Sequence, residues 1–266
     1  MTALAAYVDG IGLLGPAIPD WPTGARVLTG EMAWVRSPTQ LPPPQCLPSA
    51  ERRRTGAIVR LALAVGLEAT SRAGIDPTTL PAVFSSSGGD GENCHEICRV
   101  LATAERQVSP TRFHNSVHNA AAGYWGIATG ATAASNALCA YDASFGAGLL
   151  EALTQVAVEG IPVLLIAYDA SYPEPMRSER PIPDAFGVAL VLSPAAGAAS
   201  FAHLALSLGG APADRMPEAG LESLRVAIPA ARSLPLLAHL ARRSAGRVVL
   251  DYLDGQHLAV QVSACP

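Results

Sequence analysis

The 266-residue sequence contains no lysine, and all 18 of its basic residues are arginine. The absence of lysine excludes Schiff-base catalysis and a phosphate-binding loop that depends on a lysine ammonium group. Charged residues make up only 15% of the chain, and the formal net charge is -4. The only basic run is Arg52–Arg54, which offers little to the phosphate backbone of a nucleic acid. We therefore expect no nucleic-acid partner.

Long uninterrupted apolar runs are also missing, although 50% of the residues are hydrophobic. This pattern predicts no membrane span and enough apolar material for a large core. No basic segment followed by an apolar stretch opens the sequence, as a secretory leader would require. The cysteines lack any paired spacing, which favours reduced thiols; they are Cys46, Cys94, Cys98, Cys139 and Cys265. Together these features predict a cytoplasmic protein.

Apolar strand-like runs alternate with helical patterns, which predicts an α/β protein with a central sheet. We expect strands at Ala3–Leu14, Leu80–Ser86, Ile161–Tyr168 and Ala185–Ser193, helices at Glu51–Ala73, Asn93–Arg106, Ala143–Glu159 and Leu221–Arg243, and a C-terminal hairpin of Arg247–Asp254 and His257–Val262. The proline-rich segment Trp34–Pro48 predicts an extended surface loop.

The most informative region is Phe113–Gly160. It reads F-H-N-S-V-H-N-A-A-A-G-Y-W, then A-S-N-A-L-C-A-Y-D-A-S-F-G-A-G-L-L-E-A-L, and continues into V-E-G-I-P-V-L-L-I-A-Y-D-A. This region resembles the core of the β-ketoacyl synthase family in the thiolase superfamily, where a strand runs into a tight turn that bears a nucleophilic cysteine at the start of a buried helix. A helix N-terminus favours the thiolate because its free N–H groups and dipole stabilise negative charge.

The resemblance implies a thiolase-like layered α/β/α/β/α fold with a shortened C-terminal half. Residues 1–266 are then one domain, in which residues 1–193 resemble the family and residues 194–266 form a reduced second half. The helix Ala143–Glu159 is expected to be buried between sheets, because one of its faces is rich in glycine and alanine and nearly free of charge.

The sequence departs from the family at the nucleophile. When the helix is aligned through Gly148–Ala152, the nucleophile position falls on Asp142, and an aspartate cannot perform thiolate chemistry. Cys139 lies three residues earlier, in the strand or at the start of the turn. After Leu192 there is neither a histidine-bearing H-T-x-G-T segment nor a G-F-G-G loop. In this combination the chain resembles short ketosynthase-like subunits, similar to chain length factors, of aryl polyene and xanthomonadin-type pathways.

That resemblance implies a non-catalytic subunit that pairs with an active β-ketoacyl synthase in polyene, fatty-acid-like or polyketide biosynthesis, with an acyl carrier protein as a second candidate partner. The pairing is expected to involve Phe113–Gly126 and the edge strand at Ala133–Ala140. The candidate interface or pocket residues are Phe113, His114, Asn115, Ser116, His118, Asn119, Tyr141, Asp142 and Phe145. No catalytic residue, metal or cofactor is expected, and Asp142 is interpreted as the N-cap of the helix that follows it.

Two alternatives remain open. The chain is a divergent acyltransferase or decarboxylating ketosynthase that uses Cys139 or Asp142, or it is a stand-alone module that binds an acyl group or an acyl carrier protein. His114 with His118, and Cys94-His95-x-x-Cys98, have ligand-type residues but not the paired spacing of a structural zinc site. We therefore expect these histidines to form hydrogen bonds and Cys94 and Cys98 to pack as small hydrophobic residues.

Overall fold

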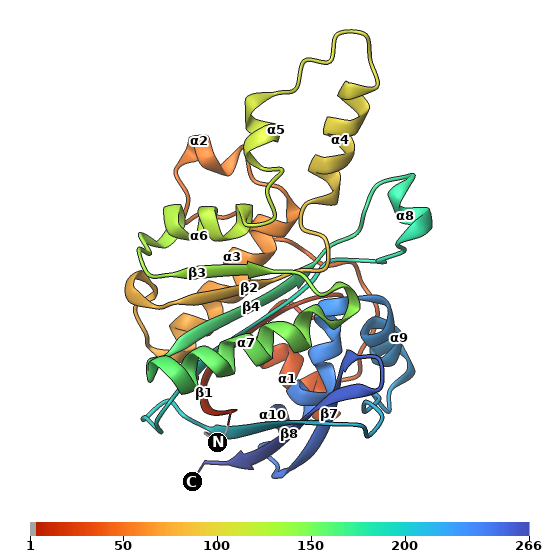
Figure 1. Cartoon of the computed structure of the whole chain (residues 1–266). Coiled ribbons are helices and arrows are strands. Elements are labelled where there is room, and N and C mark those ends of the chain that lie inside the picture. The colour runs from red at the N-terminus through yellow and green to blue at the C-terminus, as the bar shows by residue number, and fades with distance from the viewer. Residues whose placement is uncertain (1–3, 266) are drawn as a thin grey trace.

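The computed structural model describes residues 4–265 and contains one mixed sheet of eight strands (Figure 1). In sheet order these strands are β3 (Ser135–Leu138), β2 (Ala82–Ser85), β4 (Val163–Asp169), β5 (Phe186–Ser193), β1 (Leu4–Leu14), β6 (Ala202–Gly209), β8 (Gln256–Ala264) and β7 (Gly246–Leu253). β2 runs parallel to β3 and β4, and the pairs from β4 to β7 are antiparallel. Of the first expected strand, Ala3 lies outside the described residues.

The central strands separate two hydrophobic cores. Every residue of β4 and β5 is buried, as the continuous apolar runs of these strands predict. Successive side chains of a strand point to opposite faces, so Leu164 and Ile166 of β4 enter one core while Val163 and Leu165 enter the other. The sheet is therefore covered on both faces.

Helices α3 (Ala57–Ala73) and α6 (Ala120–Thr129) cover the first face. The backbone of α3 lies directly on β1, because Gly10 and Gly12 leave no side chain between them: a Cβ at Gly10 would come 2.8 Å from the nitrogen of Ala73. The expected helix Glu51–Ala73 is divided in the structure, where α2 (Ser49–Arg52) is followed by a break before α3. The break covers residues 53–56 and ends at Gly56, which has extended backbone at the N-cap of α3.

Helices α7 (Ser144–Glu159), α10 (Leu234–Arg242) and α1 (Trp21–Thr29) lie against the second face, together with the 3-10 helix η3 (Pro229–Ser233). The sheet bends so that β7 and β8 cover the other side of α7. A Cβ at Gly148 would lie 2.8 Å from Cβ of Ser85 in β2, and a Cβ at Gly146 would lie 2.7 Å from the carbonyl oxygen of Asp251 in β7. The helix is buried as expected, although it lies between strands of one sheet and not between two sheets.

The C-terminal half is short. Instead of one helix over Leu221–Arg243, α9 (Ala219–Ala227), η3 and α10 follow one another, because Pro229 and Pro235 each begin a new helical segment. The inward residues Leu204 and Leu206 of β6 and Val260 and Val262 of β8 are apolar and buried, whereas Ser207 and Gln261 on the outward face are exposed. This polar outward face can meet water without a further helical layer.

An arm formed by α4 (Gly91–Leu101) and α5 (Pro110–His114) rises from the body (Figure 1). Only Gly91 and Asn93 of α4 are buried, and no residue of α5 is. The remaining short elements are η1 (Pro77–Thr79), η2 (Tyr141–Ala143) and α8 (Met176–Glu179). No helix in residues 4–265 has the length and apolar character needed to cross a membrane.

Candidate functional site

A tight turn joins the edge strand β3 to α7, and it contains Tyr141 and Asp142. Tyr141 has a φ of 53°, in the left-handed region that residues other than glycine rarely adopt. Ser144 holds this turn, since its Oγ accepts a hydrogen bond from the nitrogen of Ala140 at 3.1 Å and donates one to the carbonyl oxygen of Tyr141 at 2.7 Å. The Tyr141 side chain is 62% exposed. The turn therefore presents Tyr141 at the surface.

Asp142 does not cap α7, so the sequence-based interpretation of its role is wrong. Ala143 occupies the N-cap position, and no side chain caps the helix. Asp142 instead binds two arginines: Oδ1 accepts from Nη2 of Arg180 at 2.6 Å, and Oδ2 accepts from Nη2 of Arg232 at 3.0 Å. Asp142 precedes the cap position by one residue, and charge-assisted bonds to guanidinium groups are stronger than bonds to neutral N–H groups.

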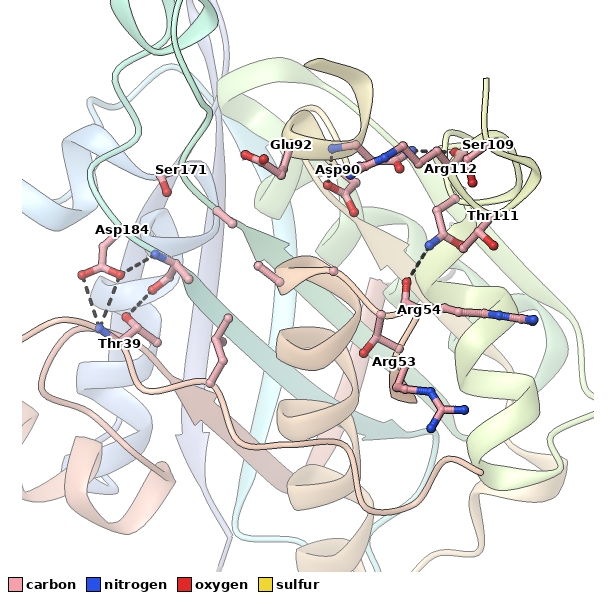
Figure 2. A pocket seen from close by; sticks show the side chains of 18 residues that line it. Thr39, Arg53, Arg54, Asp90, Glu92, Ser109, Thr111, Arg112, Ser171 and Asp184 are labelled. Carbon is pink, nitrogen blue, oxygen red and sulfur yellow. Dashed lines mark hydrogen bonds between the residues drawn. The ribbon is translucent and has the colours of Figure 1, made fainter. Parts of the chain in front are cut away.

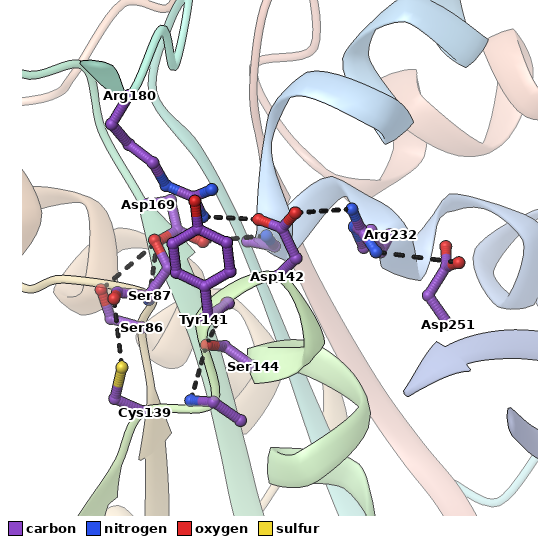
Figure 3. Close-up of polar contacts among 12 residues, drawn as sticks. Ser86, Ser87, Cys139, Tyr141, Asp142, Ser144, Asp169, Arg180, Arg232 and Asp251 are labelled. Carbon is purple, nitrogen blue, oxygen red and sulfur yellow. Dashed lines mark hydrogen bonds and ion pairs between the residues drawn. The ribbon is translucent and has the colours of Figure 1, made fainter. Parts of the chain in front are cut away.

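The ion pairs of Asp142 continue into the C-terminal part of the molecule (Figure 3). Nη1 of Arg232 lies 3.7 Å from Oδ1 of Asp251, whose Oδ2 lies 2.5 Å from Nη1 of Arg225. Arg225 also pairs with Glu222, one turn earlier in α9, at 2.8 Å. Positive and negative groups alternate along this ion-pair network, so it joins the turn before α7 to β7 and α9 without a net local charge.

Cys139 is exposed and lies before the turn, not at the tip of α7. Its Sγ donates a hydrogen bond to the carbonyl oxygen of Ser87 at 3.1 Å. This contact engages the protonated thiol, whereas attack on a thioester requires the thiolate. The geometry therefore gives Cys139 none of the activation that a helix N-terminus provides.

Asp169, at the end of β4, is a buried carboxylate that sequence reasoning missed. Oδ1 accepts from the nitrogen and Oγ of Ser87 at 2.8 and 2.6 Å, and Oδ2 accepts from the nitrogen of Ala230 at 2.9 Å. Burial raises the pKa of Asp169 to about 6, and the hydrogen bonds from Ser87 and Ala230 oppose that rise. The signal available in the sequence was an aspartate directly after an apolar strand.

The polar segment before α6 mainly secures the base of the arm. Asn115 is buried, donates to the carbonyl oxygen of Arg54 at 2.8 Å and accepts from the Tyr124 hydroxyl at 3.2 Å. His118 contacts the carbonyl oxygen of Ser86 through Nε2 at 3.1 Å. The other predicted residues of this segment are exposed; they are Phe113, His114, Ser116 and Asn119.

Three further placements differ from what the sequence suggested. Phe145 is 1% exposed and belongs to the core between α7 and the sheet, so it is not at a surface of this chain. Cys94 and Cys98 are exposed and do not pack as small hydrophobic residues, because α4 turns only Gly91 and Asn93 toward the body.

Within residues 4–265, no group of three or more histidine, cysteine, aspartate or glutamate side chains is arranged to hold a metal ion.

A cavity of about 710 Å³ lies between the start of α3, the arm and the segment that follows β4 (Figure 2). Its charged lining residues are Arg53, Arg54, Arg112, Asp90, Glu92 and Asp184. Asn115 is the one predicted site residue that lines it. Burial raises the pKa of Asp90, whose Oδ1 accepts from the nitrogen of Asn93 at 2.9 Å. Positive and negative groups balance in this lining, and none of the turn residues reaches it.

Residues 29–245 match the family model described as the N-terminal domain of β-ketoacyl synthase. A chain of the ketosynthase ApeO in complex with its chain length factor ApeC, from Xenorhabdus doucetiae, is 23% identical, with a TM-score of 0.73 over 97% of this chain and 99% of that one. A chain of the ishigamide ketosynthase/chain length factor is 15% identical, with a TM-score of 0.71 over 98% of this chain and 100% of that one.

A third solved structure, AntDE:AntF, is described as a type II PKS acyl-carrier protein in complex with its ketosynthase bound to the hexaketide. It is 13% identical, with a TM-score of 0.74 over 100% of both chains. A search of curated proteins found no match. These likenesses establish a thiolase-like ketosynthase fold over essentially the whole chain.

Proposed function

The chain belongs to the β-ketoacyl synthase family, and we propose that within it the chain is a non-catalytic subunit that pairs with an active ketosynthase as a chain length factor does. The pair would take part in the biosynthesis of a polyene, fatty-acid-like or polyketide product, and an aryl polyene is the specific candidate product. Residues 1–193 and 194–266 form one domain, and the pairing of β1 with β6 supports this part of the proposal. A cytoplasmic location is also part of the proposal.

The observation that carries this proposal is the pairing of Asp142 with two arginines. The family resemblance puts the nucleophile at this position, where the chain has a carboxylate bound to Arg180 and Arg232. A carboxylate is a poor nucleophile toward a thioester. The two guanidinium groups bound to Asp142 also neutralise its charge and occupy its oxygens, which makes it a weaker nucleophile still. The Arg180 guanidinium also lies 3.8 Å from the ring centroid of Tyr141. These side chains fill the turn where an acyl group would be attached.

The surface near the turn supports pairing. Phe113 is 70% exposed and Val117 is 52% exposed, and a largely apolar cavity of about 440 Å³ lies between them and α6. β3 is at the edge of the sheet, with one side free for a partner strand. Apolar residues gathered on an exposed arm beside a free strand edge are typical of a protein interface. An acyl carrier protein would reach the pair through the active ketosynthase.

The alternative enzyme hypothesis requires Cys139 or Asp142 to attack an acyl thioester, and the contacts of both residues oppose it. The experiment is co-expression with a ketosynthase from the same gene neighbourhood, size-exclusion chromatography, and treatment with a cysteine-directed ketosynthase inhibitor or an acyl thioester. We expect a 1:1 complex with the mass adduct on the ketosynthase. An acyl adduct on this chain would establish the enzyme hypothesis, and a persistent monomer that binds the carrier protein would establish the binding-module hypothesis.

A further inference from the structure

A mostly apolar cavity lies between α3, the end of β1 and the proline-rich segment of residues 34–48. Its volume is about 500 Å³, within the range of about 300–1,000 Å³ that is typical of small-molecule sites. None of its lining residues belongs to the arm, to the turn before α7 or to β3. The apolar part of the lining comes from three segments; it consists of Leu14 of β1, Leu63, Ala64 and Leu67 of α3, and the prolines at positions 42–44.

The backbone of the proline wall, residues 42–44, is already satisfied within the chain. Proline has no N–H group, so this wall offers no backbone donor. The carbonyl oxygen of Pro42 accepts from Nε of Arg60 in α3 at 3.2 Å. The next two carbonyl oxygens accept from the backbone nitrogens of Gln45 and Leu47, at 2.9 and 3.0 Å. The wall is therefore tied to α3 in the absence of a ligand, and it presents mainly the carbon atoms of its rings.

Each charged side chain of the lining also has a partner in the chain. Both oxygens of Glu68 accept from backbone nitrogens at 2.9 Å, and Oε1 accepts from Nε of Arg72 at 3.0 Å. Asp20 accepts from the nitrogen of Thr23 at 2.8 Å, and Arg60 is bonded to the proline wall. Two carboxylates and two guanidinium groups leave the lining without net charge. An ion that entered would lose its hydration and find no unpaired counter-ion, so the cavity favours an uncharged molecule.

We propose that this cavity binds an uncharged, apolar small molecule. Leu63 and Leu67 lie one turn apart on α3, and the proline rings provide a second carbon surface, so a ligand between them is removed from water on more than one side. An aromatic ring would lie against the proline rings, as in proline recognition by aromatic grooves, and an alkyl group would pack along α3. The site is separate from the pairing surface, so its failure and the failure of the proposed function would be seen in different experiments.

The test uses the whole chain and the uncharged fluorophore N-phenyl-1-naphthylamine, whose emission rises in apolar surroundings. We expect saturable binding at one site per chain. Pro43→Asp places a carboxylate in the proline wall and should weaken binding about tenfold or more. Pro43 is exposed, so the variant should remain folded, which circular dichroism verifies. Pro38→Asp changes an exposed proline of the same segment outside the lining, and as the control it should change the affinity less than about twofold.

A second variant, Ala64→Leu, fills part of the cavity from α3 with a good helix former and should also weaken binding about tenfold or more. Displacement of the fluorophore by 2-naphthol and by 1-octanol distinguishes an aromatic from an alkyl ligand, according to which competes better. The anion 2-naphthoate should compete at least about tenfold more weakly than 2-naphthol. The proposal is overturned if binding is not saturable, if 2-naphthoate competes as well as 2-naphthol, or if Pro43→Asp and Ala64→Leu bind the fluorophore as tightly as the unchanged protein.

Discussion

At the scale of single residues, the candidate site is defined by how its charges are paired. Asp142 and Asp169 are both carboxylates close to the turn before α7, and they have opposite surroundings. Asp142 is partly exposed and has two cationic partners, whereas Asp169 is buried and receives hydrogen bonds mainly from backbone and hydroxyl groups. Their substitutions therefore have different expected consequences.

Replacing Asp142 should affect stability and assembly but not the chemistry of the pair. Asp142→Ala leaves Arg180 and Arg232 without their shared carboxylate, and we expect a loss of about 1–2 kcal/mol. Asp142→Asn should cost nearly as much, because a neutral amide cannot balance two guanidinium groups, whereas a helix cap would tolerate asparagine. Urea unfolding measures both variants, with Glu159→Gln as the control for an exposed carboxylate without an ion pair. An asparagine variant that assembles normally but abolishes product formation would show that Asp142 is catalytic.

Asp169 should make stability depend on pH. Its pKa is raised to about 6 in the folded protein, from 3.8. The folded state therefore holds the proton more tightly, and the stability contributed by this group is fully present below about pH 4 and lost as the pH rises through about 6. Urea unfolding between pH 4.5 and 8 should show this decline, and Asp169→Asn should remove it. The asparagine variant should also be less stable throughout, by about 1–3 kcal/mol, because its amide NH₂ faces N–H donors. Parallel pH profiles for the two proteins would contradict the assignment.

At the scale of elements, α7 is the helix on which the arrangement depends. It lies between β2 and β7 because Gly146 and Gly148 permit close approach on both sides. Isolated helix propensity would favour alanine at either position, so tertiary packing has overridden local preference. The arm of α4 and α5 is the opposite case, since few of its residues pack on the body of this chain.

Gly148→Ala should destabilise the protein although alanine is the better helix former. The new Cβ would lie 2.8 Å from Cβ of Ser85 and 2.9 Å from Cδ1 of Leu165. Overpacking of this kind costs about 1–3 kcal/mol. The matched control is Gly123→Ala in α6, where a Cβ meets nothing within 4 Å, and it should stabilise by up to about 1 kcal/mol. Urea unfolding of the two variants should therefore give changes of opposite sign; equal signs would mean that α7 is not tightly enclosed.

At the scale of the whole molecule, the proposed pairing surface is formed by the arm, the turn and the edge strand β3. Its exposed large apolar side chains are Leu101 and Phe113 on the arm and Tyr141 in the turn, and Val117 lies just after the arm. The other edge of the sheet is different, because Asp214 covers β7 through hydrogen bonds with both backbone groups of Val249. One edge is thus open for a partner and the other is protected.

Phe113→Asp should prevent pairing without unfolding the chain. Phe113 is 70% exposed, so its replacement should change stability by no more than about 0.5 kcal/mol, while a charge placed at the centre of an apolar contact should abolish co-elution with the ketosynthase. Leu253→Asp, at a residue 51% exposed on the opposite edge, is the control and should leave the complex intact. If the control disrupts the complex and Phe113→Asp does not, the interface lies elsewhere.

The sequence by itself determined the α/β class, the strands at the centre of the sheet, the buried helix α7 and the family. These are local properties, because an apolar run, a helical period and a turn motif are each carried by neighbouring residues. The same local pattern suggested one helix over residues 51–73 and another over residues 221–243, and in both regions a glycine or proline interrupts the helix in the structure.

Only the tertiary structure decided what the candidate site contains. Asp142 is 38 residues from Arg180 and 90 from Arg232, and Asp169 is 82 residues from Ser87. The energy of a carboxylate depends on which charges and N–H groups lie within a few ångströms, and folding brings those groups together from segments that have no common pattern in the sequence. The helix cap expected at Asp142 was a local solution, and it gave way to two ion pairs with residues distant in the sequence, of which the pair with Arg232 joins the two halves of the chain.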